Sequence, residues 1–101
     1  MAEIKINYDL TIQRAHRIKE LAEGVRKVAN DVRNAEDDSR AVWEGYAADT
    51  YREQCEVLEN ELISIETKMN KLADAVIRIA DTIKAADENV ASAAEKLEGG
   101  N

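Results

Sequence analysis

The sequence of 101 residues contains no proline, no phenylalanine and only four glycines. A sheet protein needs a tight turn every few residues, and such turns depend on glycine and proline. The shortage of turn residues therefore argues against a sheet and favours long helices. Charged residues make up 35% of the chain and apolar residues 45%, which is typical of a single small helical domain with exposed faces.

Residues with nucleophilic or metal-binding chemistry are also scarce. Cys55 is the only cysteine, which excludes an intrachain disulfide, and His16 is the only histidine. The two cannot supply the ligands of a metal site, and the chain has no Ser-His-Asp set and no glycine-rich phosphate loop. The sequence therefore predicts a protein that is not an enzyme and that uses no cofactor and no metal. Cys55 lies on an apolar stripe, where we expect it to pack in the core.

Long apolar stretches are absent as well. Nowhere do about 18 apolar residues follow one another, so the sequence predicts no membrane span. Residues 1–7 lack the apolar run of a signal peptide. We therefore expect a protein that is made in the cytoplasm and that either stays there or is exported without a cleaved N-terminal signal.

The centre of the chain has few basic residues. The formal charge is −7, and residues 36–61 hold only two bases, Arg40 and Arg52, against nine acids. The acids are Glu36, Asp37, Asp38, Glu44, Asp49, Glu53, Glu56, Glu59 and Glu61. An acidic centre argues against binding to nucleic acid and against insertion into membranes, because both favour clustered lysine and arginine. A solvated helix surface is the simplest interpretation of these acids.

Two long segments carry an apolar residue every three or four positions, which is typical of amphipathic helices. We expect helices over about 8–42, starting near Asn7, and 47–97, with loose ends at 1–7 and 98–101. The unbroken seven-residue repeat of the second segment predicts helices wound around each other. The predicted hairpin and dimer core consists of Ile18, Leu21, Val25, Val28, Val32, Leu58, Leu62, Ile65, Met69, Leu72, Val76 and Ile79.

Two such helices joined by a short turn predict an all-α, antiparallel hairpin whose longer second helix overhangs the first. Small residues at Ala15, Ala22 and Ala29 lie beside the first stripe and would allow close helix approach. The second helix has a further apolar line, formed by Ile63, Ala73, Ile77 and Ala80. A two-helix unit with a spare apolar line needs a partner, so we expect a dimer that forms a four-helix bundle.

The tripeptide Trp43-Glu44-Gly45 lies between the two helical segments and holds the only tryptophan. Glycine can adopt the positive φ that ends a helix, and the tryptophan before it can cover the open end of a hairpin. With this turn, its length, Ile4 and Ile6 before the first helix and Ala47-Ala48-Asp49 after the turn, the chain resembles the WXG family of type VII secretion substrates. The resemblance covers nearly the whole chain. It implies helical hairpins that pair antiparallel into four-helix bundles and are exported folded through a membrane ATPase.

The resemblance also implies a second export element late in the second helix. The actinobacterial form, a tyrosine followed four residues later by an acid, is absent because no tyrosine follows Tyr51. The looser Firmicute spacing is matched by Ile83, Asp87, Val90 and Ala94. Trp43 and Gly45 would form the first export element, and antiparallel pairing would bring Trp43 of one chain near Asp87 of its mate.

These features predict a secreted substrate or co-secreted partner of a type VII system, which acts by protein binding as a homodimer. One alternative is an adaptor that pairs with a related protein or with the helical N-terminal domain of a larger secreted toxin. Another is an ordinary coiled-coil module in which the tryptophan only caps a turn.

Overall fold

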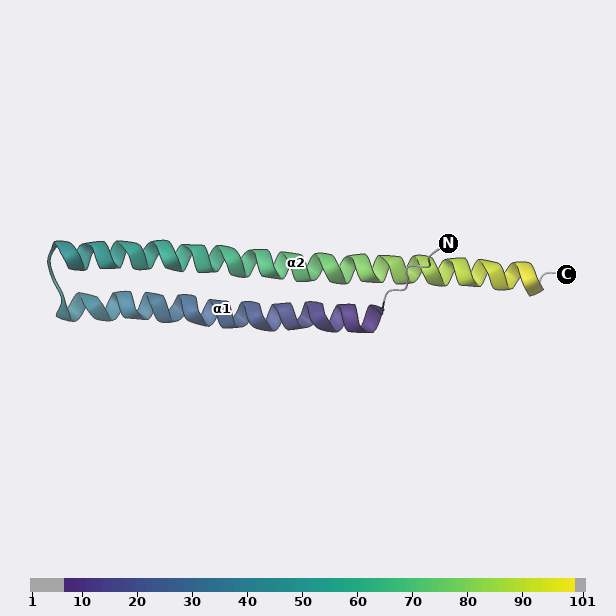
Figure 1. Ribbon diagram of the computed structural model, residues 1–101, viewed down its shortest axis with the longest axis horizontal. Coiled ribbons are helices and arrows are strands. Elements are labelled where there is room, and N and C mark those ends of the chain that lie inside the picture. The colour runs from purple at the N-terminus through teal and green to yellow at the C-terminus, as the bar shows by residue number, and fades with distance from the viewer. Residues whose placement is uncertain (1–6, 100–101) are drawn as a thin grey trace.

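A computed structural model describes residues 7–99 as two long helices, α1 (Tyr8–Val42) and α2 (Tyr46–Gly99). The helices run antiparallel, lie side by side and are joined by a short turn (Figure 1). The molecule is a rod of 86 × 20 × 17 Å. The predicted all-α hairpin is therefore confirmed. Ile4 and Ile6, which contributed to the family resemblance, lie outside the described residues.

Helix α1 has the predicted limits. Asn7 caps its start, because its side-chain Oδ1 accepts a hydrogen bond of 3.0 Å from the backbone N–H of Leu10. This bond satisfies one of the backbone donors that a helix leaves free in its first turn. Asp9 adds a negative charge to the same turn, where it interacts favourably with the helix dipole.

Helix α2 is longer than predicted at both ends. It begins at Tyr46 and continues to Gly99, so Glu98 and Gly99 belong to the helix and not to the loose end expected at 98–101. From 84 to 98 every side chain is exposed, and this part of α2 extends past the start of α1 (Figure 1). The predicted overhang is thus present. The helix continues because nothing before Gly99 interrupts the pattern of good helix formers.

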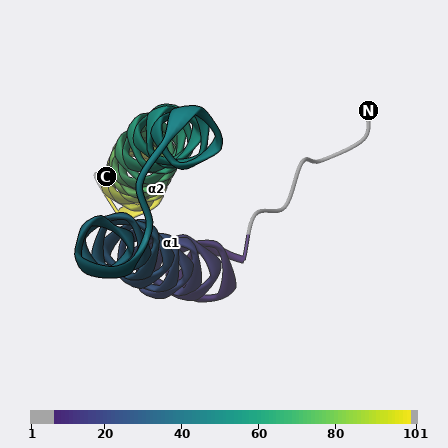
Figure 2. The same ribbon diagram turned by 90° about the vertical axis from the view of Figure 1, so that its left-hand side faces the viewer.

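Small residues fill the seam between the helices. In α1, Ala15, Ala22 and Ala29 are buried at seven-residue intervals, and Glu36 takes the next position of the same line. The buried residues of α2 are Ala48, Cys55, Ala73 and Ala80, so the core position predicted for Cys55 is confirmed. Alanine side chains are short, so the backbones of α1 and α2 can lie close together along the rod (Figure 2).

The predicted core residues lie beside this seam and not in it. Six of them are half-buried, namely Ile18, Val25, Val32, Leu62, Met69 and Val76. The other six are between 46% and 56% exposed, and we call them the apolar face: Leu21, Val28, Leu58, Ile65, Leu72 and Ile79. The prediction is therefore wrong for the apolar face as part of the interior of the single hairpin, whereas the other six residues are partly buried beside the seam. Their role in a dimer core stays a prediction.

The line interpreted as a spare apolar surface of α2 also has a different position. Ala73 and Ala80 are buried in the seam against α1, and Ile63 and Ile77 are half-buried beside it. The larger apolar side chains, and not this line, are the ones that remain uncovered.

Two ion pairs join the helices on the flank opposite the apolar face. Arg26 binds Glu66 at 3.1 Å, and Lys19 binds Asp74 at 2.5 Å, both from α1 to α2. These contacts favour a rotation of the helices in which the charged flanks meet on one side. The alanine line then faces the partner helix, and the apolar face is turned toward solvent on the other side.

Candidate functional site

The turn between the helices is built around Trp43 and Gly45. Helix α1 ends at Trp43, whose backbone N–H donates a hydrogen bond of 2.9 Å to the carbonyl of Ser39. Gly45 has a φ of +113°, a conformation that L-residues with a side chain rarely adopt. Helix α2 starts directly afterwards, with the N–H of Asp49 donating to the carbonyl of Gly45 at 3.0 Å. The positive φ predicted for Gly45 is confirmed.

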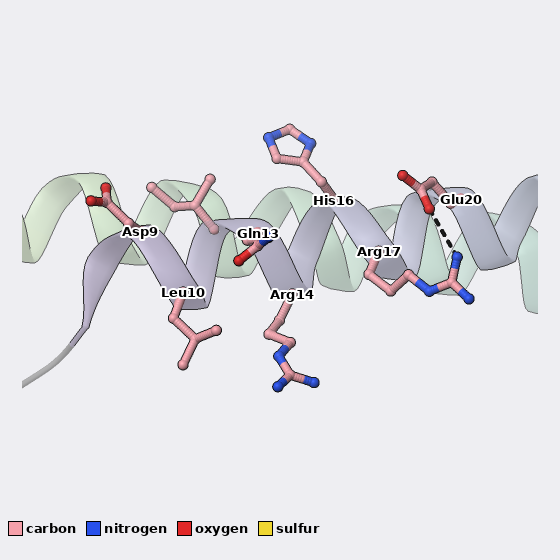
Figure 3. A pocket seen from close by; sticks show the side chains of 8 residues that line it. Asp9, Leu10, Gln13, Arg14, His16, Arg17 and Glu20 are labelled. Atoms are coloured by element: carbon pink, nitrogen blue, oxygen red, sulfur yellow. Dashed lines mark hydrogen bonds and ion pairs between the residues drawn. The ribbon is translucent and has the colours of Figure 1, made fainter.

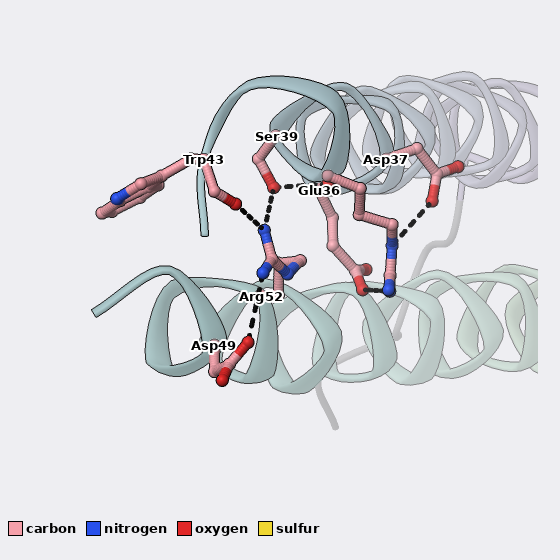
Figure 4. A network of polar contacts seen from close by, with 7 residues as sticks. Glu36, Asp37, Ser39, Trp43, Asp49 and Arg52 are labelled. Carbon is pink, nitrogen blue, oxygen red and sulfur yellow. Dashed lines mark hydrogen bonds and ion pairs between the residues drawn. The ribbon is translucent and has the colours of Figure 1, made fainter. Parts of the chain in front are cut away.

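The indole of Trp43 remains accessible at the end of the rod. It is 43% exposed and packs against the ring of Tyr51, with 5.4 Å between ring centroids and 43° between the planes. Tilted aromatic pairs of this kind are favourable. The ring points away from the polar groups of the turn (Figure 4). The neighbouring Cys55 thiol raises the pKa of Tyr51 above its ordinary value.

Arg52 ties the two helices together behind this indole. Its Nη1 donates to the backbone carbonyl of Trp43 at 3.0 Å and to Ser39 Oγ at 3.3 Å, and its Nη2 donates to Asp49 Oδ1 at 3.1 Å (Figure 4). Ser39 Oγ in turn donates to the carbonyl of Glu36 at 2.6 Å. The Arg52 side chain is only 14% exposed. One guanidinium therefore binds hydrogen-bond acceptors at the end of α1 and in the first turn of α2 at the same time.

A buried carboxylate lies next to this network. Glu36 is only 4% exposed, and its Oε1 accepts a bond of 2.6 Å from Arg40 Nη2 on the following turn of α1. Asp37 lies 3.9 Å from Arg40 Nε. Burying an unpaired charge costs free energy, and the ion pair with Arg40 offsets this cost for Glu36 in the alanine line of the seam.

The residues of the second candidate element lie on the other end of the hairpin. Asp87 accepts a hydrogen bond from the hydroxyl of Tyr8, so its carboxylate is bound to the first residue of α1. This bond is the largest cause that raises the pKa of Tyr8 above its ordinary value, followed by burial. Ile83 is half-buried, whereas Val90 and Ala94 are exposed on the overhang. Within one chain, therefore, Asp87 lies far along the rod from Trp43 at the turn.

A shallow depression lies on the surface of α1, away from the turn. The depression shown in Figure 3 is formed by residues 9–20 of α1 alone, and it includes His16 and the ion pair between Arg17 and Glu20 at 2.9 Å. Residues 7–99 contain no group of histidine, cysteine and acidic side chains that is arranged for a metal ion. Across the same range, neither helix has a stretch of the length and hydropathy that a bilayer crossing requires.

Sequence reasoning missed two contacts of this site. The position of Arg52 was an available signal, because Arg52, Ala73 and Ala80 share one seven-residue line of α2 and a charged residue in a seam line needs partners. The pairing of Tyr8 with Asp87 had no such signal, because it depends on the register between the helices.

Comparison with known proteins identifies one family. The model of the WXG100 family, described as "Proteins of 100 residues with WXG", matches residues 3–88, which is most of the chain. The match includes the turn at Trp43 and Gly45, α1 and most of α2. No curated protein and no solved structure matches the chain.

Proposed function

The chain belongs to the WXG100 family, whose members are small helical proteins of type VII secretion that usually act as dimers, and on this basis we propose that it is a secreted substrate of such a system. It acts by binding other proteins and carries out no chemistry. It pairs with a second copy of itself and is recognised by the secretion ATPase through its turn and its second helix.

One observation carries the proposal of pairing. The apolar face extends from Leu58 to Ile79 of α2, about 30 Å of the 86 Å rod, with about half of each side chain exposed. A patch of this extent is unusual on a monomer and is typical of a surface that binds a protein. A second copy is the occupant that fits, because its identical face has the same length and spacing and two hairpins then form a four-helix bundle.

The exposure of the two candidate export elements supports recognition by the ATPase. Trp43 is partly open to solvent at the turn, and the overhang presents Val90 and Ala94. Antiparallel pairing would place the turn of one protomer beside the overhang of the other. Trp43 of one chain and Asp87 of its mate would then contribute to one composite surface.

Secretion from a type VII host tests the proposal. Trp43→Ala and Asp87→Ala are each expected to abolish secretion while the chain accumulates inside the cell as a folded dimer. Tyr46→Ala is the matched control for Trp43, because Tyr46 is an exposed aromatic residue of the same turn. Glu88→Ala is the matched control for Asp87. Normal secretion of both Trp43→Ala and Asp87→Ala would contradict the proposal.

Sedimentation of the purified chain at micromolar concentration tests the choice of partner. A symmetric dimer supports self-pairing. A stable monomer that dimerises only with a related protein or a toxin domain would contradict self-pairing and identify the chain as an adaptor.

A further inference from the structure

Five charged residues border the apolar face on its outer edges. The apolar face belongs to two seven-residue repeats, at positions 21, 28, 35 and 42 of α1 and 58, 65, 72 and 79 of α2. Each of the five charged residues is three or four residues from such a position, which places it about 40–60° farther round the helix, on the side away from the seam. On α1 these rim residues are Arg17, Asp31 and Asp38, and on α2 they are Glu61 and Lys68. All five are exposed, and among the described residues only Arg17 has an ion pair within the hairpin, with Glu20 on the surface of its own helix. The rim is therefore available to a partner that covers the face.

The two helices have a fixed register against each other. The contacts Ser39–Arg52, Arg26–Glu66 and Lys19–Asp74 join residues whose numbers add to 91, 92 and 93. Residues 27 and 28 of α1 are therefore level with residues 64 and 65 of α2 along the rod.

Two hairpins can pair through their apolar faces about a twofold axis that lies between the faces and runs perpendicular to the rod. Each helix then lies against its own copy, and residues pair symmetrically about the point that the axis crosses. Arg17 meets the partner's Asp38 if the axis crosses α1 between 27 and 28. Glu61 meets the partner's Lys68 if it crosses α2 between 64 and 65. These two points are level in the hairpin, so one axis satisfies both charge pairs.

We infer that the chain self-pairs antiparallel in this one register, and that the pairs Arg17–Asp38 and Glu61–Lys68 between protomers select it. This inference rests on the antiparallel self-pairing proposed above and adds its alignment and the residue pairs that fix it. The same axis places Val28 and Ile65 each against its own copy and Leu58 against the partner's Leu72. Apolar residues then meet apolar residues along the whole face.

The parallel arrangement is the main competitor, and apolar burial does not exclude it. There α1 faces the partner's α2, and residues of equal level meet, so Leu21 would pack against the partner's Leu72. The rim distinguishes the two arrangements, because Asp31 would then meet the partner's Glu61. Like charges held together in an interface oppose association, so the rim charges favour the antiparallel dimer.

Charge reversal at Glu61 gives opposite results in the two arrangements. The helix neighbours of Glu61, at three and four residues on each side, are Val57, Leu58, Ser64 and Ile65, so the change removes no ion pair within the helix. In the antiparallel dimer, Glu61→Lys places a lysine opposite the partner's Lys68 at both symmetry-related contacts. We expect the dissociation constant of the dimer to rise about tenfold at low salt. Adding Lys68→Glu should restore the affinity, and about 1 M salt should suppress the effect. Glu95→Lys makes the same change in net charge on the overhang and should leave the affinity unchanged.

Cysteine cross-linking reports the register directly. In a Cys55→Ala background, Ile65→Cys lies near the axis, so two copies should form a disulfide under mild oxidation. Leu58→Cys is the control, because its two copies would be about 20 Å apart along the rod, which is beyond disulfide reach.

The outcomes separate this inference from the proposed function. A wild-type monomer at micromolar concentration overturns both the self-pairing and the register. The register alone is overturned if the wild type is a dimer and Glu61→Lys dimerises as tightly or more tightly. It is also overturned if adding Lys68→Glu does not restore the dimer affinity of Glu61→Lys. Efficient cross-linking of Leu58→Cys without that of Ile65→Cys overturns it as well.

Discussion

Two glycines of this chain have opposite roles. Gly24 lies in the middle of α1, and a Cβ added there meets no atom within 4 Å. Glycine in a helix interior lowers stability because the unfolded chain has more conformations to lose. We expect Gly24→Ala to raise the free energy of unfolding by about 0.5–1 kcal/mol, measured by urea denaturation followed by circular dichroism.

Gly45 provides the contrast for that measurement. The space around it is equally open, but its φ is +113°. Gly45→Ala should therefore lower the free energy of unfolding by about 1–2 kcal/mol, since a side chain disfavours this backbone conformation. Equal effects of the two substitutions would contradict the assignment of Gly45 as the residue that makes the turn possible.

The bond between Tyr8 and Asp87 gives a pH-dependent contact. The pKa of Tyr8 is raised in the fold, so its contribution to stability is present below the unfolded pKa near 10 and is lost as the pH rises through the folded value. Asp87→Asn removes the charged acceptor, and we expect it to move the pKa of Tyr8 back toward its ordinary value. An NMR titration of the tyrosine ring carbons measures this change, and an unaltered Tyr8 curve in Asp87→Asn would show that the bond does not form in solution.

At the scale of the helix ends, Arg52 is the residue on which the turn depends. Arg52→Met keeps much of the side-chain volume but leaves the Trp43 carbonyl and Ser39 Oγ without this donor. We expect a loss of about 1–3 kcal/mol of stability, because both acceptors lie in or near the seam. Acrylamide quenching of the Trp43 fluorescence should also increase, because the backbone of Trp43 is no longer held.

Arg33→Met is the control for this prediction. It makes the same chemical change on an exposed position of α1 for which the described structure shows no ion pair. Its unfolding and its quenching should match those of the unsubstituted chain. If Arg52→Met behaves in the same way as Arg33→Met, the network in Figure 4 does not hold the turn.

The helices, the turn and part of the seam could be predicted from the sequence. The small residues of α1 and Cys55 lie in the seam, but the large apolar residues expected there do not. Apolar spacing and the position of Gly45 are local signals, and they located α1 to the residue. The choice between the Ala22 line and the Leu21 line is not local, since both repeat every seven residues on adjacent parts of one surface. It depends on pairs such as Arg26–Glu66, which join residues forty positions apart. Large apolar side chains were therefore expected in a seam that alanines occupy.

At the scale of the whole molecule, the rod consists of two helices side by side along the length of α1 and of α2 alone beyond it. Beyond Asp87, whose carboxylate binds Tyr8, the described part of the overhang makes no hydrogen bond or ion pair with α1. An isolated helix of so few turns is marginal in water. We expect the backbone amides of residues 90–98 to exchange with solvent deuterium much faster than those of residues 55–75. Equal protection of both segments by hydrogen-exchange mass spectrometry would indicate that a partner or a second contact covers the overhang.

The alanine seam has a consequence for how much of this protein is folded in a cell. Alanine buries little apolar surface, so a single hairpin gains little free energy from its own seam, and the apolar face would be buried further only by the second copy proposed above. Folding and assembly are then linked by mass action, and the thermal midpoint should rise with protein concentration. Freshly made chains at low abundance would be open to proteases, and only an accumulated pool would be protected. Export of a paired form would thus depend on how much of the chain the cell has already made.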